Sequence, residues 1–522
     1  MLFHTLPFLL FMLVVLPVFY LLRRTPLWTP WLLLASYFFY GWWNPYYLLL
    51  IFYSTALDYT LVALMDHCPG RREQAALPNG PRDRALSAAL VVSIGLTIAL
   101  VIGAIAGPAA LRPTFWFFSV LVGLMALGAY LRSRRVWLLI SIVNNLALLL
   151  FFKYARFAIQ NLAFLGLHLP DPSTLMPPGF TYALPVGISF FTFQSMSYTI
   201  DFYLGNVERE RGFLRFATFV CFFPQLMAGP IERAKHLLPQ FRRTPVFRLE
   251  NLTDGMSLFL VGLFKKLALA NYLALYVERV YDNPAAQPAS ALVMGTIAFA
   301  WQIFFDFSGY TDMARGVARM MGFNLILNFN NPYLATGLGD FWSRWHISLS
   351  SWFRDYVYIP LGGNRHGTLL TWRNLFLTFL ISGIWHGASW TFAIWGALHG
   401  IGLIATRGME RAAWYRERVP LLLKRVWVFA YVCFAWIFFR AASLSDALLV
   451  VRRIFTGVWS SPAIPALMVL LACLVWLYES LYESRVRPVL AHGLVRVCLA
   501  AAMILYLCLF SAGGGAFIYF QF

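Results

Sequence analysis

Two histidines stand in apolar or aromatic surroundings, where an imidazole has few ordinary reasons to occur. His386 lies in "GIWHGASWTFAIWGALHG" (383–400), and His346 lies in "FWSRWHISLSSWFRD" (341–355). A polar side chain inside a bilayer is costly, so an ionisable residue there is first considered as functional. An imidazole has an ordinary pKa of about 6.5 and can remove a proton from a hydroxyl near neutral pH. These two residues therefore predict general-base chemistry on a hydroxyl group.

His386 is the stronger of the two candidates. Gly383 and Gly387 stand close to it in sequence and leave space for another backbone or a thin ligand to approach the ring. Trp385 is the flanking aromatic side chain that we assign to substrate binding. The alternative is a neutral imidazole that hydrogen-bonds a facing helix and has no catalytic part.

His346 is surrounded in sequence by polar groups, among them Arg344, Ser348 and Arg354. We expect it to be solvent-accessible at an interface or funnel mouth, and catalysis and a structural hydrogen bond stay equally open. His399 follows His386 roughly opposite in helical phase if one helix continues through both, so we expect it to be structural.

The motifs of other enzyme classes do not occur in the sequence. No two histidines are spaced at i, i+3 or i, i+4, and HExxH is absent, so the spacing disfavours a zinc site. The absence of GxSxG disfavours a serine nucleophile, and the absence of a Walker motif disfavours an ATPase.

A further polar cluster interrupts the apolar run "WQIFFDFSGYTDMARG" (301–316), with Asp306, Asp312 and Arg315. We expect Asp306 to pair structurally with Arg315 or with Arg344. A transporter or flippase that moves an acyl or lipid-linked substrate through a relay of these charges is the alternative function. The three residues are also weaker candidates for substrate binding.

The elements that must position these residues are membrane helices. Of 522 residues, 60% are hydrophobic and 12% are charged, against roughly 45–50% and about 25% in soluble domains. Apolar runs of about 20 residues, enough to cross a bilayer, recur along the chain. The sequence predicts an all-α polytopic protein with ten to thirteen crossings. The more polar and aromatic stretch 309–369 predicts short helices and loops that lie in the membrane interface or dip into the bilayer.

The net charge of +19 comes from Lys and Arg residues that cluster in short loops between apolar runs. This distribution follows the positive-inside tendency of membrane proteins and disfavours nucleic acid as a partner. Stretches 66–84 and 407–425 are expected to be cytoplasmic connectors. Without repeats or a soluble region of domain size, residues 1–522 predict one integral membrane domain.

Four long stretches resemble the membrane-bound O-acyltransferase family, in particular its bacterial branch of alginate and peptidoglycan O-acetylation and teichoic-acid D-alanylation. They are "FFPQLMAGPIERA" (222–234), "FDFSGYTDMARGVARMMG" (305–322), "FWSRWHISLSSWFRDYVYIPLGGNR" (341–365) and "SGIWHGASWTFAIWGALHG" (382–400). The motif core covers about 184–406. The resemblance implies a helical ring with re-entrant and interfacial helices around a central channel.

The resemblance also implies a function. His386 matches the family's catalytic histidine and His346 its second functional histidine. The donor is implied to be acetyl-CoA or another acyl thioester, with no permanently bound cofactor and no metal. We expect Arg344, Arg354 and Arg365 to form a basic rim that holds the donor's phosphates.

The implied location is the bacterial inner membrane, with the chain crossing it several times among membrane lipids. The implied partners are a periplasmic or extracellular SGNH-type acetyltransferase or esterase-fold protein and the polysaccharide export machinery. The polymer stays open among alginate, cellulose, peptidoglycan and other exopolysaccharides.

Overall fold

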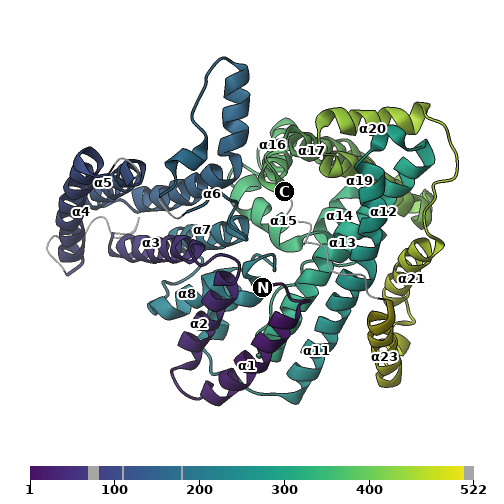
Figure 1. The fold of residues 1–522 in the computed structure, drawn as a ribbon, viewed down its shortest axis with the longest axis horizontal. Coiled ribbons are helices and arrows are strands. Elements are labelled where there is room, and N and C mark those ends of the chain that lie inside the picture. Colours follow the sequence, from purple (N-terminus) through teal and green to yellow (C-terminus); the bar gives the residue numbers. More distant parts are fainter. Residues whose placement is uncertain (69–80, 109–110, 178–179, 511–522) are drawn as a thin grey trace. The chain divides into compact units, whose positions relative to one another are not determined.

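The computed structural model describes residues 1–68, 81–108, 111–177 and 180–510 (Figure 1). Within these ranges the regular elements are all helical, so the prediction of an all-α protein is confirmed. The chain divides into two compact units. The main parts of the first are Leu13–Met227 and Ile231–Val246, the main part of the second is Phe247–Phe522, and the helix α1 (Leu6–Leu22) is shared by both. Each unit is described by itself.

The first unit is built around one buried carboxylate. Its helices are α2 (Trp28–Gly41), α3 (Tyr47–His67), α4 (Pro81–Ala106), α5 (Arg112–Leu131), α6 (Arg134–Phe164), α7 (Ile188–Leu204), α8 (Phe213–Cys221), α9 (Phe223–Leu226) and α10 (Ala234–Phe241). Asp58 of α3 is fully buried. It accepts hydrogen bonds from Ser141 Oγ at 2.6 Å and Asn145 Nδ2 at 2.9 Å on α6, and from Ser195 Oγ on α7. These bonds fix three helices to one another through a group that is costly to bury unsatisfied.

The second unit holds every residue that the sequence singles out for chemistry. Its helices are α11 (Leu249–Phe264), α12 (Asn271–Tyr281), α13 (Ala289–Met320), α14 (Leu338–Arg344), α15 (Ile347–Phe353), α16 (Thr368–His386), α17 (Trp390–Arg411), α18 (Ala413–Arg418), α19 (Leu421–Arg440), α20 (Leu444–Thr456), α21 (Ala466–Tyr482), α22 (Arg487–Leu490) and α23 (Gly493–Phe510). A π-helical turn, η3 (Lys265–Ala270), joins α11 to α12, and a second one, η6 (Arg354–Tyr358), follows α15.

In the described part of the chain, 8 helices are long and apolar enough to cross a membrane. They span Tyr47–His67, Arg84–Ala106, Arg112–Leu131, Arg134–Phe164, Leu249–Tyr281, Ala289–Met320, Leu421–Arg440 and Gly493–Phe510. Two shorter apolar helices, Leu6–Leu22 and Ala466–Tyr482, accompany them. The multi-pass expectation is confirmed, whereas the larger number of ten to thirteen crossings stays a prediction.

The stretch 309–369 differs from its prediction in its first part. Residues up to Met320 continue the helix α13, and only the following residues form loops and the short helices α14 and α15. The polar residues are accommodated because α13 packs directly on α11, which runs beside it in Figure 1. A Cβ on Gly262 would stand 2.5 Å from Gly309 O, and a Cβ on Gly316 would stand 2.6 Å from Gly255 O. The two backbones therefore touch, and the helix continues because its neighbour covers the polar face.

Candidate active site

His386 is the last residue of α16 and lies where the chain breaks before α17. The break spans residues 387–389, and Ser389 Oγ accepts the Thr391 N–H to cap the new helix. Because the helix does not continue through both histidines, the phase argument that separated His399 from His386 does not apply. The chain reverses here, so both histidines belong to one packed pair of helices.

The space beside the glycines is filled by protein. A Cβ on Gly383 would stand 2.4 Å from Phe392 O, and a Cβ on Gly396 would stand 2.4 Å from Phe379 O. A Cβ on Gly387 would stand 2.1 Å from the ring of Phe392. Of the two expected occupants, the structure shows another backbone and an aromatic ring rather than a thin ligand. These glycines let α17 approach His386 closely.

The imidazole of His386 is 5% exposed and stands among aromatic rings. Its centroid lies 4.9 Å from that of Trp385, 5.0 Å from that of Trp395 and 5.4 Å from that of Phe439. All three rings meet it edge to face, which is a favourable geometry for aromatic pairs. Trp385 thus contacts the histidine directly, while its assignment to substrate binding stays a prediction.

His346 stands between α14 and α15 with a φ of 43°, in the left-handed region. Its Nδ1 lies 3.1 Å from Asn328 Oδ1, which also accepts the Ser348 N–H at 3.2 Å and the Ser348 hydroxyl at 2.9 Å. A backbone N–H can only donate, so these contacts identify the Asn328 atom as the amide oxygen. Nδ1 of His346 therefore carries the proton, and Nε2 is the nitrogen with the basic lone pair.

The expected solvent accessibility of His346 is wrong. The residue is 1% exposed, and its ring stands perpendicular to that of Phe307 at 4.6 Å. The reason is that α15 and the loop around Asn328 enclose it, with the Ile347 N–H bonded to Asn328 O at 2.9 Å. Burial lowers the pKa of His346 to about 3, so the imidazole is neutral near pH 7.

A continuous file of ring contacts runs from His346 to His386. Each successive pair of rings along this file has its centroids between 5.0 and 6.3 Å apart. The members in order are His346, Phe329, Trp345, Trp436, Trp395 and His386. The structure thus places the two predicted histidines at the two ends of one aromatic cluster.

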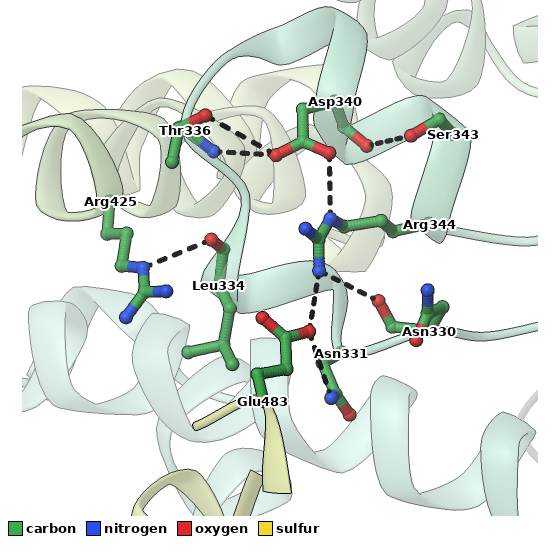
Figure 2. A network of polar contacts seen from close by, with 9 residues as sticks. All are labelled: Asn330, Asn331, Leu334, Thr336, Asp340, Ser343, Arg344, Arg425 and Glu483. Atoms are coloured by element: carbon green, nitrogen blue, oxygen red, sulfur yellow. Dashed lines mark hydrogen bonds and ion pairs between the residues drawn. The ribbon is translucent and has the colours of Figure 1, made fainter. Parts of the chain in front are cut away.

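Arg344 lies in a network of polar contacts, which Figure 2 shows. Its Nε bonds Asp340 Oδ1 at 2.7 Å, and its Nη1 bonds Glu483 Oε1 at 2.7 Å. Burial alone would lower the pKa of Arg344, but the bonds from Asp340 and Glu483 raise it above its ordinary value. The guanidinium ties α14 to the end of α21, and its assignment to a phosphate-binding rim stays a prediction.

The other two rim candidates are exposed. Arg354 pairs with Asp355 at 2.8 Å in the π-helical turn η6, and its side chain is 64% exposed. Arg365 lies in the loop before α16. An exposed pair such as Arg354–Asp355 contributes little to stability, so its arginine can exchange partners. Because Arg365 is also exposed, both arginines are accessible to a charged ligand.

The partner expected for Asp306 is wrong. Asp306 lies 2.7 Å from Lys266, and both side chains are nearly fully buried. Asp312 pairs with Lys265 at 2.8 Å and with Arg315 at 3.5 Å. The physical reason is the π-helical turn η3, which presents two consecutive lysines to α13. Asp306 is therefore paired with a lysine in place of the expected arginine, and the choice between a structural part and a relay stays a prediction.

Comparison with known proteins identifies the family to which this chain belongs. The model of the family described as "MBOAT, membrane-bound O-acyltransferase family" matches residues 206–445, which include both histidines. The probable alginate O-acetylase AlgI of Pseudomonas putida is 40% identical over 350 residues, 66% of this chain and 70% of that protein. This chain belongs to the membrane-bound O-acyltransferase family.

Two further relatives of this chain support the same conclusion. The probable alginate O-acetylase AlgI of Pseudomonas aeruginosa is 41% identical over 348 residues, 66% of this chain and 65% of that protein. The peptidoglycan O-acetyltransferase of Helicobacter pylori is 38% identical over 346 residues, 61% of this chain and 64% of that protein. The match thus spans less than two thirds of these two relatives. The resemblance found in the sequence motifs is confirmed, and these relatives are named as an O-acetylase and an O-acetyltransferase.

Some residues around the site of this acyltransferase family member escape sequence reasoning. Asn328, which sets the tautomer of His346, stands in "NFNNP" beside two other asparagines and a proline and carries no distinguishing signal. Lys265 and Lys266 do carry one, since two lysines in an apolar run call for acidic partners. Among the described residues, no three His, Cys, Asp or Glu side chains are grouped to hold a metal ion.

Proposed function

We propose that this chain is an O-acetyltransferase that passes acetyl groups from a cytoplasmic acetyl thioester toward an exported polysaccharide. The observation that carries the proposal is the placement of His386, buried at the break between α16 and α17 and inside the region that matches the acyltransferase family. The names of the relatives, alginate O-acetylase and peptidoglycan O-acetyltransferase, support acetyl as the group and a polysaccharide as its destination.

In the proposed reaction His386 acts as the general base. It accepts the proton of an acceptor hydroxyl while the hydroxyl oxygen forms a bond to the acetyl carbon. The carbon–sulfur bond of the thioester then breaks, and the proton passes from His386 to the departing thiolate. The products are an acetyl ester and a free thiol, with no oxidation or reduction. Such proton transfer contributes about 10²- to 10⁴-fold to the rate.

His346 is proposed as the second functional histidine. The bond to Asn328 keeps its proton on Nδ1, and burial keeps the ring neutral. A neutral imidazole whose Nε2 carries a lone pair can accept a hydrogen bond from a substrate group. Aromatic rings in contact with one another connect it to His386.

A cavity lined by arginines is consistent with the proposal that the donor is an anionic thioester such as acetyl-CoA. A cavity of about 610 Å³ lies between the start of α16 and the end of α17, and Arg407, Arg411, Asn364 and Thr368 are among its lining residues. Arginine recognises phosphate groups through charge-assisted bonds. We expect Arg407→Gln to raise the KM for acetyl-CoA at least severalfold with little change in kcat, measured on the purified chain. An unchanged KM would remove this cavity from the donor path.

The acceptor and the partner also belong to the proposal. The immediate acceptor is a hydroxyl group, on the polymer or on an SGNH-type partner outside the membrane that passes the acetyl group on to the polymer. The export machinery delivers that polymer, and the bacterial inner membrane is the proposed location. The identity of the polymer is decided by analysis of the host's polysaccharide.

The experiment compares His386→Ala with His492→Ala in a host that lacks the natural gene. His492 is an exposed histidine near the start of α23, so its loss controls for a generic effect of removing an imidazole. With equal amounts of each variant in the membrane, we expect His386→Ala to abolish O-acetylation of the exported polymer and His492→Ala to preserve it. Unchanged acetyl content with His386→Ala would refute the proposal.

The transporter alternative makes a different prediction. It assigns the relay to Asp306, Asp312 and Arg315, all of which stand in ion pairs in the structure. Buried pairs of this kind hold both charges in place, which favours a structural part for them. Flux of an acyl or lipid-linked substrate across vesicles of purified chain, without acyl transfer, would favour the transporter over the acetyltransferase.

A further inference from the structure

One group of buried nitrogen atoms near His386 has no partner among the described residues. His399 is 0% exposed, and both of its ring nitrogens lack a hydrogen bond within the described part of the chain. The same holds there for the indole nitrogens of Trp342, Trp395 and Trp436. Buried polar atoms are nearly always hydrogen-bonded, so a cluster of such atoms indicates a site for a polar ligand.

The four rings form one connected cluster. The centroid of His399 lies 4.9 Å from that of Trp342 and 4.9 Å from that of Trp395. Trp436 stacks on Trp395 at 5.7 Å. Trp395 also contacts His386 at 5.0 Å, so one indole touches both histidines. The cluster therefore adjoins the proposed general base.

The chemistry of the cluster selects its ligand. An indole nitrogen only donates, and a neutral imidazole has one donor and one acceptor. The three tryptophans and His399 thus offer more donors than acceptors, and none of the three indoles can ionise to balance a charge. A group with acceptor oxygens and no formal charge fits best, and the carbonyl of an acyl thioester is such a group.

The rings are carried by rigid elements. Trp342 stands on α14, His399 and Trp395 on α17, and Trp436 on α19. The Tyr431 hydroxyl of α19 donates to Leu398 O at 2.6 Å, next to His399. A Cβ on Gly402 would stand 2.3 Å from that hydroxyl, so the two helices are closely packed at this turn. The packing of α17 on α19 therefore holds His399, Trp395 and Trp436 in place.

We propose that His399, Trp342, Trp395 and Trp436 form a carbonyl-binding site that holds the acyl group of the donor beside His386. The inference rests on the proposed function and names the residues that recognise its acyl group. During attack by the acceptor hydroxyl, the carbonyl oxygen gains negative charge, and N–H donors bound to it stabilise the transition state. His399, assigned to the scaffold on sequence grounds, thereby becomes a substrate-binding residue.

The test uses two variants that keep an aromatic ring and remove nitrogen, Trp395→Phe and His399→Phe. The matched control is Trp137→Phe, because Trp137 is also fully buried but its Nε1 is already bonded to Cys68 Sγ at 3.3 Å. With acetyl-CoA as donor, we expect each test variant to lower kcat about 10²- to 10³-fold, as the loss of one oxyanion donor does elsewhere. The control should keep kcat within about twofold, because its lost bond lies in the first unit.

A binding measurement separates this inference from the proposed function. S-ethyl-CoA has a methylene group in place of the carbonyl, so the wild-type chain should bind acetyl-CoA more tightly than this thioether. The test variants should lose that preference, and Trp137→Phe should keep it. If the wild-type chain turns over acetyl-CoA while the variants retain both rate and preference, the carbonyl site is refuted and the acetyltransferase stands. If the wild-type chain does not turn over acetyl-CoA but its preference for acetyl-CoA over S-ethyl-CoA is lost in the variants, the carbonyl site stands and the proposed function is refuted.

Discussion

Substitutions of Asn328 test whether its side-chain amide fixes the tautomer and the protonation state of His346. Its Oδ1 accepts from His346 Nδ1, from the Ser348 N–H and from the Ser348 hydroxyl. All three residues are at most 1% exposed, so water does not replace the lost acceptor easily. Asn328→Leu removes it and leaves three donors buried. At about 1–3 kcal/mol for each unsatisfied group, with part relieved by relaxation, we expect a loss of about 3–5 kcal/mol of stability.

Asn328→Asp is the informative companion variant. The carboxylate keeps the acceptor and retains most of the fold, but it places a negative charge beside a neutral imidazole. A nearby opposite charge favours the protonated form of histidine, so the pKa of His346 rises. A protonated ring has no basic lone pair, and acyl transfer near pH 7 should fall and recover as the pH is raised.

The assay is acetyl transfer by the purified chain between about pH 6 and pH 9, together with its thermal midpoint in detergent. Ser348→Ala serves as the control, because it removes only one of the three donors to Asn328. Wild-type stability in Asn328→Leu would contradict the hydrogen-bond argument. An unshifted pH profile in Asn328→Asp would refute the tautomer argument for His346.

Three further predictions concern packing, charge and pH. Gly396→Ala places a Cβ 2.4 Å from Phe379 O and should cost about 1–3 kcal/mol through overpacking, seen as a lower thermal midpoint. Lys266→Met leaves the buried Asp306 without its lysine and should cost about 3–5 kcal/mol in the same measurement. A hydrogen bond to Glu232 raises the pKa of His236 against the opposing effect of burial. The His236 side chain is 41% exposed, so its pair with the buried Glu232 should add less than about 1 kcal/mol of stability at pH 6, which is lost as the pH rises through the raised pKa.

Each of these predictions has a matched control. Gly408→Ala introduces a Cβ with no heavy atom within 4 Å, so it should be neutral or stabilise α17 by up to about 1 kcal/mol. The double variant Lys266→Met/Asp306→Leu should recover most of the loss, since it leaves no single buried charge. Glu232→Gln should flatten the pH dependence of the midpoint. A double variant no more stable than the single one would contradict the ion-pair argument.

The two histidines could be found from the sequence because burying a polar imidazole in apolar surroundings costs free energy. Apolar composition likewise predicts the helices, since length and hydropathy decide what can cross a bilayer. The burial of His346 could not be predicted, because it depends on a loop around Asn328 that is distant in sequence. The site of His399 was missed for a similar reason, since the break at residues 387–389 changes which rings face one another.

The acidic residues of α13 illustrate how local geometry decides a functional question. From the sequence, Asp306 and Asp312 could belong either to structural ion pairs or to an ion relay. The π-helical turn η3 inserts an extra residue per turn and presents Lys265 to Asp312 and Lys266 to Asp306. A relay requires groups that can exchange protons with their neighbours in turn, whereas the Asp306 carboxylate lies 2.7 Å from one buried lysine. A turn that no hydropathy pattern reveals therefore favours a structural part for these two carboxylates, in ion pairs with consecutive lysines.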